Sequence, residues 1–124
     1  MSNESKVVKE LMLELARWGC TCWRNETAGA WVGRTVYTKG TEVSLRDAKR
    51  IQAGLCVGSP DIVGYTSDGR FVGIEAKRTK GGRLSKEQEQ FIAVARSNSC
   101  VVGVVRSVEE LQELLSSYGL TRGC

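Results

Sequence analysis

Two short apolar runs, at residues 62–65 and 71–74, are joined by the turn signal Asp68-Gly69 and bounded by acidic residues. Asp61 precedes the first run, and Glu75 follows the second. Runs of this length on either side of an Asp-Gly pair predict a β-hairpin. Because the length of the loop sets which residues lie opposite each other, it also decides whether the two carboxylates share a face of the sheet.

The loop length that brings the carboxylates together is three residues. With Ser67-Asp68-Gly69 as the loop, Asp61 lies opposite Glu75, and Lys77 shares their face because residues two apart on a strand do so. A two-residue loop would instead pair Asp61 with Ala76. Like charges directly opposite destabilise a strand pair by roughly 0.2–1 kcal/mol, unless a bound cation reverses the sign. The pattern therefore predicts a divalent cation and an attacking water, as in nucleases, with plain surface charges as the alternative.

The same residues resemble a known nuclease family. Pro60-Asp61 followed by Glu75-x-Lys77 is similar to the core motif of the PD-(D/E)xK nucleases. With Gly58 two residues before Pro60, and with Leu84-Ser85-x-x-Gln88 after the hairpin, the pattern resembles the virus-type replication-repair nuclease (VRR-NUC) branch. The resemblance covers most of the chain, from near residue 4 to near residue 105.

This resemblance implies a set of catalytic and metal-binding residues. The catalytic set is Asp61, Glu75, Lys77 and Gln88, and the metal ligands are Asp61, Glu75, the Ala76 backbone carbonyl and, by likeness to related resolvases, Glu4. Mg²⁺ suits two carboxylates because it keeps several waters, and Mn²⁺ is expected to substitute. For two of these residues a purely structural role stays open. Gln88 fits a capping box with Ser85, and Glu4 favours a helix N-terminus through the dipole.

Basic residues flank the candidate metal site in sequence. The net charge is +4, from 18 basic and 14 acidic residues, and no acid occurs between Ala76 and Lys86. Cations around an acidic pocket attract a phosphodiester substrate, although a solvated basic loop is the simpler alternative. The resemblance adds an Arg-Asn pair with a substrate or supporting role. The residues expected to contact DNA are Arg24, Asn25, Arg46, Lys49, Arg50, Arg78, Lys80, Arg83 and Lys86.

Hydrophobic periodicity predicts the remaining elements. We expect a helix over 4–18, a strand over 20–25, a helix over 85–98, a buried strand over 100–105 and a terminal helix opened by a Ser107-x-x-Glu110 capping box. Both faces of the hairpin are largely apolar, which predicts a sheet covered on both sides. The chain therefore reads as one α/β domain over residues 1–124, and the resemblance implies a restriction-endonuclease-like mixed central sheet flanked by helices, with an αβββαβ-type core.

Residues 26–57 are the least readable part of the chain. Residues 31–38 and 41–45 can form a hairpin around the turn Lys39-Gly40, and residues 45–53 can form a short basic helix. An insertion at this point can set substrate choice or make a dimer contact. The sequence does not decide between these alternatives.

The absence of histidine removes several classes of function. It excludes His-based nucleases, triads that contain histidine and histidine metal ligands. The five cysteines, Cys20, Cys22, Cys56, Cys100 and Cys124, contain no C-x-x-C pair, so we expect reduced thiols and no zinc site. No apolar stretch approaches the roughly 20 residues of a membrane helix and no signal peptide is visible, so we expect no membrane partner and a cytoplasmic protein, in the host cytoplasm if viral.

The resemblance carries the functional expectation furthest. It implies a Mg²⁺-dependent, structure-selective endodeoxyribonuclease. Stand-alone phage-type members resemble Holliday-junction resolvases that act as homodimers, so we expect a homodimer acting on a four-way junction. A flap or nicking endonuclease of replication or repair, and a non-catalytic nucleic-acid-binding module, are the alternatives. One-metal or two-metal catalysis and any sequence preference stay open.

Overall fold

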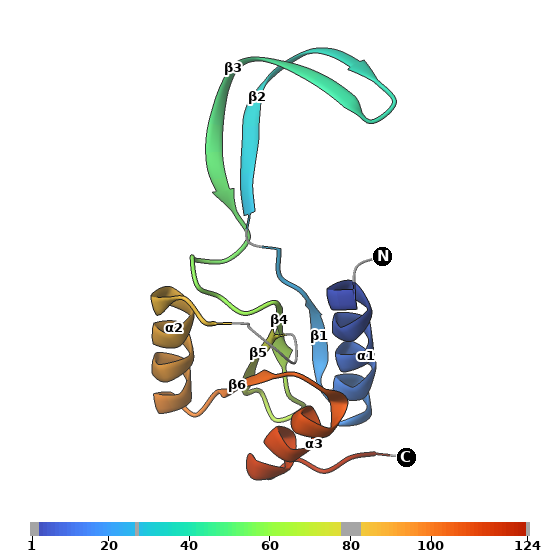
Figure 1. Ribbon diagram of the computed structural model, residues 1–124, viewed down its shortest axis with the longest axis vertical. Coiled ribbons are helices and arrows are strands. Elements are labelled where there is room, and N and C mark those ends of the chain that lie inside the picture. Colours follow the sequence, from blue (N-terminus) through green and yellow to red (C-terminus); the bar gives the residue numbers. More distant parts are fainter. Residues whose placement is uncertain (1–2, 27, 78–82, 124) are drawn as a thin grey trace.

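Four strands form the sheet at the centre of the fold, in a computed structural model that describes residues 3–26, 28–77 and 83–123 (Figure 1). The strands are β1 (Thr21–Arg24), β4 (Ile62–Tyr65), β5 (Phe71–Ala76) and β6 (Val101–Val105), in the order β1-β4-β5-β6. β4 runs antiparallel to both β1 and β5, whereas β6 runs parallel to β5. The sheet is therefore mixed, which confirms the predicted class.

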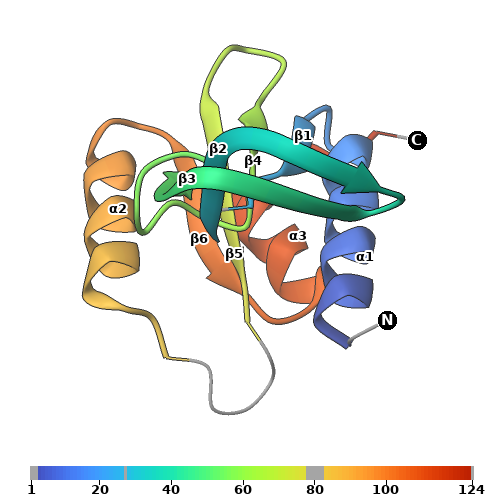
Figure 2. The same ribbon diagram turned by 90° about the horizontal axis from the view of Figure 1, so that it is seen from above.

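Helices cover both faces of this sheet. α1 (Asn3–Arg17) and α3 (Val108–Ser117) lie on one side, and α2 (Lys86–Ser97) lies on the other (Figure 2). The core follows the order α1-β1-β4-β5-α2-β6, which is the predicted αβββαβ arrangement with α3 added at its end. α3 begins after Ser107, whose side chain accepts from the Glu110 N–H, but Glu110 accepts from the Arg106 N–H. The terminal capping box therefore forms only in part. No helix in the described ranges is long and apolar enough to cross a bilayer.

Strand alternation divides the core into two hydrophobic clusters. The cluster on the α1 and α3 side contains residues such as Leu11, Leu15, Ile62, Val72, Ile74, Val101, Leu111 and Leu115. The cluster on the α2 side contains Phe71, Phe91, Ile92, Ala95 and Val102. Because residues of opposite parity on β5 enter different clusters, the sheet is buried on both faces, as its apolar pattern predicts.

The hairpin formed by β4 and β5 has the register of a three-residue loop. Tyr65 pairs with Phe71 and Ile62 with Ile74, and the Thr66 N–H donates to the Arg70 carbonyl at 2.8 Å. Gly69 closes the loop with φ 87°, in the left-handed region that glycine tolerates best. Asp61 and Glu75 are the next residues beyond the Ile62–Ile74 pair, so this register is the predicted one in which they lie opposite each other.

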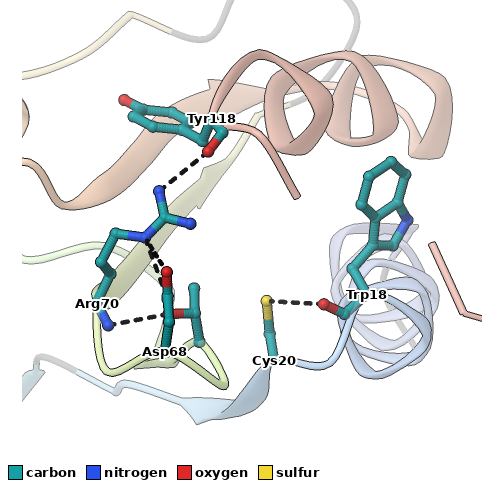
Figure 3. A network of polar contacts seen from close by, with 6 residues as sticks. Trp18, Cys20, Asp68, Arg70 and Tyr118 are labelled. Carbon is teal, nitrogen blue, oxygen red and sulfur yellow. Dashed lines mark hydrogen bonds and ion pairs between the residues drawn. The ribbon is translucent and has the colours of Figure 1, made fainter. Parts of the chain in front are cut away.

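A polar network connects this turn to the C-terminal end of α3 (Figure 3). The Asp68 carboxylate accepts from the Thr66 hydroxyl and, at 3.1 Å, from Arg70 Nε, and the first of these bonds is the larger cause of its lowered pKa. Arg70 Nη1 then donates to the Tyr118 carbonyl at 3.0 Å, and the Tyr118 hydroxyl donates to the Val102 carbonyl at 3.1 Å. The loop is thus held by β6 and by the end of α3.

A second network joins α1 to the C-terminal segment through Glu14, which is 1% exposed. Its carboxylate accepts from Arg17 Nη1 at 3.1 Å, Trp18 Nε1 at 2.9 Å, Gln112 Nε2 at 3.1 Å and Arg122 Nε at 2.8 Å. The bond from Arg122 is the largest influence on the pKa of Glu14, which falls to about 2 although burial alone would raise it.

The segment between β1 and β4 forms a long hairpin that projects from the core (Figure 1). Its strands are β2 (Ala28–Lys39) and β3 (Glu42–Ala53), and we call them together the arm. The hairpin expected around Lys39-Gly40 is therefore confirmed, and the short helix considered for 45–53 is wrong, because the second strand continues through those residues. Those residues instead pair along β2, with Ala30 opposite Ile51 and Trp31 opposite Arg50. The ladder shifts register twice, and such bulges bend and twist a strand.

Candidate active site

The candidate site lies where β4 begins and β5 ends. Asp61 immediately precedes β4, and its Oδ2 accepts from the Ala76 N–H at 2.9 Å. Glu75 lies on β5 beside Val104 and is 1% exposed. Lys77 follows the strand, and its Nζ lies 3.9 Å from Glu75 Oε1. The structure therefore brings together the two carboxylates and the lysine that the hairpin register predicts.

Burial gives the lysine an electrostatic role at Glu75. A carboxylate removed from water loses hydration, and that loss is costly unless a charge or hydrogen bonds replace it. Lys77 supplies a positive charge, while its own N–H donates to the Val105 carbonyl at 3.0 Å and extends the pairing of β5 with β6. The backbone bond places the lysine, and its ammonium offsets the buried charge.

The donor chemistry fits a small divalent cation with few protein ligands. Across the described ranges, no three His, Cys, Asp or Glu side chains gather into a metal-binding group, so the site offers the two carboxylates Asp61 and Glu75. Mg²⁺ is usually bound by one or two carboxylates and completes its shell with waters and phosphate oxygens. Ala76 follows Glu75 in the chain and its N–H donates to Asp61, so its backbone lies beside both carboxylates. The side chain of Glu4, the further ligand expected, lies outside the described residues.

Asn25 holds the loop that carries Asp61. Its Nδ2 donates to Ser59 Oγ at 2.7 Å and to the Pro60 carbonyl at 2.8 Å. Its backbone N–H donates to the Asp61 carbonyl at 2.8 Å, and its Oδ1 accepts from the Leu55 N–H at 3.3 Å. These contacts favour the supporting role for Asn25, and its predicted DNA contact stays a prediction. The sequence gives no signal for Ser59, because an isolated serine in a loop carries no pattern.

Gly58 allows the same loop to press against the first turn of α2. It has φ +89°, and a Cβ at this position would lie only 2.4 Å from the Glu87 carbonyl oxygen. This contact brings the glycine of the Gly58-x-Pro60-Asp61 motif against the helix that begins at the Ser85-x-x-Gln88 element, although the two are far apart in sequence. Only a residue without a side chain permits this approach.

Gln88 forms the capping box at the start of α2. Its Oε1 accepts from the Ser85 N–H at 2.8 Å, and its own N–H donates to Ser85 Oγ at 3.1 Å. The capping role is therefore confirmed. The catalytic role expected for the same side chain is compatible with this contact and stays a prediction.

The basic residues expected to contact DNA fall into separate groups. Arg46, Lys49 and Arg50 lie on β3, so they belong to the arm rather than to the core around Asp61. Arg83 and Lys86 are exposed before and at the start of α2, and Arg24 is exposed at the end of β1. Arg78 and Lys80 lie outside the described residues.

Cysteine chemistry plays no visible part at this site. Cys20, Cys22, Cys56 and Cys100 are free thiols, and Cys124 lies outside the described residues. Burial is the main cause that raises the pKa of Cys20, and it raises the pKa of Cys22 to about 12. These two thiols are therefore protonated at neutral pH and are poor nucleophiles.

A comparison with known protein families gives a match. A family model described as the VRR-NUC domain matches residues 12–109 of the chain. The matched range contains the Gly58 loop, both carboxylates, Lys77 and Gln88, and it begins after Glu4. No curated protein matches the chain.

Proposed function

Since the chain belongs to the VRR-NUC family, whose members are nucleases of the PD-(D/E)xK type, we propose that it is a metal-dependent, structure-selective DNA endonuclease. The observation that carries this proposal is that one carboxylate is held by a backbone hydrogen bond and the opposite carboxylate is buried. Asp61 is held by the Ala76 N–H, and Glu75 is buried beside Lys77. Nucleases of this type generally use divalent metals, and Mg²⁺ is the ion that this donor set suits best.

The residues of the site have distinct tasks in phosphodiester hydrolysis. Asp61, Glu75 and the Ala76 carbonyl would hold the cation, which supplies an acidified water and charge stabilisation at the phosphate when it is bound. Lys77, whose Nζ is 3.9 Å from Glu75 Oε1, can orient the attacking water or neutralise a phosphate oxygen. Asn25 keeps Asp61 in place through the loop between them.

Replacement of Glu75 by glutamine tests this assignment. Glu75→Gln keeps the size of the side chain but removes the negative charge, so we expect Mg²⁺-dependent cleavage to fall about 100-fold or more. Duplex affinity should change little, because it depends mainly on phosphate contacts. Cleavage rates and fluorescence anisotropy on the same labelled DNA measure the two effects. Glu113→Gln, at an exposed position of α3, is the charge-matched control. Cleavage by Glu75→Gln at the wild-type rate would contradict the assignment.

Our proposal for the substrate is a four-way DNA junction cut by a homodimer. Its support is the resemblance to phage-type resolvases, since a two-fold dimer presents two equal sites to opposed strands. Labelled four-way junction, flap, nicked and plain duplex substrates separate the outcomes. Symmetric paired incisions support the resolvase. Single incisions at a flap or nick, binding without products, or a monomer in sedimentation at micromolar concentration would each contradict it.

A further inference from the structure

The arm is a two-stranded ribbon whose side chains lie mostly in solvent. Its strands have 12 residues each, which corresponds to a length of about 40 Å at 3.4 Å per residue. Within residues 30–51, all side chains are exposed except Ala30 and Leu45, which are partly buried. A two-stranded hairpin alone is marginally stable in water. A ribbon of this length with so few buried side chains therefore indicates a surface that a binding partner covers.

The charge of the arm is strongly one-sided. Residues 28–53 contain five basic and two acidic side chains, a net charge of +3 out of +4 for the whole chain. Arg34 lies directly opposite Arg46, although like charges opposite each other destabilise a strand pair. One of the acids, Glu42, lies opposite Lys39 at the tip. Within the described part of the chain, no ion pair joins Arg34, Arg46, Lys49 or Arg50 to a carboxylate.

We propose that the arm binds the phosphate backbone of a DNA duplex beside the cleavage site, with Arg34 and Arg46 as a paired phosphate contact. The inference rests on the proposed nuclease function. It assigns the duplex next to the cleaved bond to the arm, which lies outside the active site. A phosphate between the two guanidinium groups turns a repulsive pair into a favourable one, because each can bind its oxygens in a bidentate manner.

Dimensions and attachment agree with a duplex partner. The major groove of B-DNA admits a two-stranded ribbon, and the contour length of the bent arm, about 40 Å, is comparable to one helical turn of about 34 Å. The arm leaves the core after Asn25 and returns before Leu55, and these residues are hydrogen-bonded to each other. Asn25 also holds the Asp61 loop. Because Asn25 contacts both the base of the arm and the loop that carries Asp61, it fixes the position of a duplex bound along the arm relative to the two carboxylates.

Charge also distinguishes DNA from a second copy of the chain. The arm exposes apolar side chains, including Trp31 at 62% and Val36 at 57%, which would suit a protein surface. Two arms packed together would however bring two charges of +3 into contact, and juxtaposed like charges oppose association. Trp31 lies opposite Arg50, so an apolar side chain of the arm stands directly beside a cation that can bind a phosphate. A polyanion neutralises the charge of the arm, so the charge favours DNA over a second copy as the occupant.

The salt dependence of DNA binding tests the paired contact. We measure duplex and four-way-junction affinity by fluorescence anisotropy between 50 and 200 mM KCl for the wild type and for Arg34→Ala/Arg46→Ala. Each lost phosphate contact lowers the slope of log K against log salt by about one, so the double variant should lose about two. Lys9→Ala/Arg96→Ala removes two exposed charges from α1 and α2 and should keep the slope. Arg34→Lys/Arg46→Lys retains both charges and should also keep it.

The outcomes that overturn the inference differ from those that overturn the proposed function. A salt slope of Arg34→Ala/Arg46→Ala equal to that of the wild type would refute the arm contact. Sedimentation of this variant as a smaller species than the wild type would also refute it, because the arm would then contact a second copy of the chain. Because binding is measured without cleavage, a reduced slope would support the arm contact even if the wild type left every DNA substrate uncut. That second result would refute the nuclease function alone.

Discussion

Glu14 shows how one side chain can join distant parts of a small domain. It lies among the apolar residues of α1, and its carboxylate binds Gln112 on α3 and Arg122 in the C-terminal segment. A buried charge is tolerated when several donors replace its hydration. The four hydrogen bonds to Glu14 meet that requirement and fix the C-terminal segment against α1.

The lowered pKa of Glu14 predicts a pH-dependent stability. The carboxyl titrates at about 2 in the folded protein instead of near its ordinary value of 4.5, so its contribution is present above pH 4.5 and is lost as the pH falls towards 2. Glu14→Gln should lower the free energy of unfolding at pH 7 by about 1–3 kcal/mol. Urea unfolding followed by circular dichroism at pH 7, 5, 4 and 3 measures the difference.

The control for this measurement lies on the exposed side of the same helix. Glu10→Gln removes an equal charge from α1 without touching the network and should leave the pH profile almost unchanged. The gap between wild type and Glu14→Gln should narrow below pH 4.5. A gap that stays constant down to pH 3 would show that ionised Glu14 does not stabilise the fold.

Some residues of the site could be predicted from sequence because their geometry depends on local counting. Asp61 and Glu75 are related by one hairpin, and the position of Gly69 fixes its register. Glu14 and Asn25 could not be found in this way. Two of the four partners of Glu14, Gln112 and Arg122, lie about 100 residues away, and the side-chain partner of Asn25, Ser59, lies across an inserted arm. Contacts of that kind depend on how complete elements pack.

At the scale of elements, Gly58 controls the fit between the Asp61 loop and α2. Gly58→Ala must both adopt φ +89° and displace the Glu87 backbone, because its Cβ would lie 2.4 Å from the Glu87 carbonyl oxygen. We expect a loss of stability of about 1–3 kcal/mol from strain, with a further loss of cleavage because Asp61 moves. Thermal unfolding and cleavage of a labelled junction, corrected for the folded fraction, measure the two effects.

Gly69→Ala separates backbone strain from collision. Gly69 has the nearly equal φ of +87°, but apart from its chain neighbours no heavy atom of the described residues lies within 4 Å of the position that its Cβ would take. This variant should lose stability while it keeps its cleavage rate per folded molecule. Equal stability and equal cleavage in the two variants would show that the contact with α2 does not position the loop.

The wrong helix at residues 45–53 has a physical cause. Helices and strands of a core are recognised because one face is apolar, with a period that reflects burial. β3 pairs with β2 in a two-stranded sheet, and its described side chains are almost all exposed, so the sequence of β3 shows no period that reflects burial. The hairpin of the core could be predicted, since most apolar residues of β4 and β5 are buried.

For the whole molecule, the core and the arm should differ in stability. Strands β5 and β6 lie between helices, whereas the arm is exposed along its length. Segments with few buried contacts open at a lower free energy than the core. Hydrogen exchange followed by mass spectrometry should therefore show amides of residues 28–53 exchanging at least about tenfold faster than those of residues 71–76 and 101–105. Equal protection in both regions would contradict this division.

Hydrogen exchange in the presence of DNA tests whether the less stable arm is the part of the protein that binds the duplex. Duplex DNA should slow exchange in residues 28–53 more than in residues 101–105, because only the first group is proposed to contact it. Arg34→Ala/Arg46→Ala should lose most of that added protection, whereas Lys9→Ala/Arg96→Ala should keep it. Protection confined to the core would place the duplex elsewhere.

The attachment of the arm has a consequence for how such proteins can diversify. Both of its strands pass through one narrow junction, where Asn25 accepts from the Leu55 N–H and secures the Asp61 loop. Residues 28–53 can therefore be lengthened, shortened or exchanged for a foreign segment without a change in the register of β4 and β5. The junction makes the arm an exchangeable segment, and an engineer who grafts a new binding segment there should preserve Asn25 and avoid proline at position 55, because the bond uses the backbone N–H.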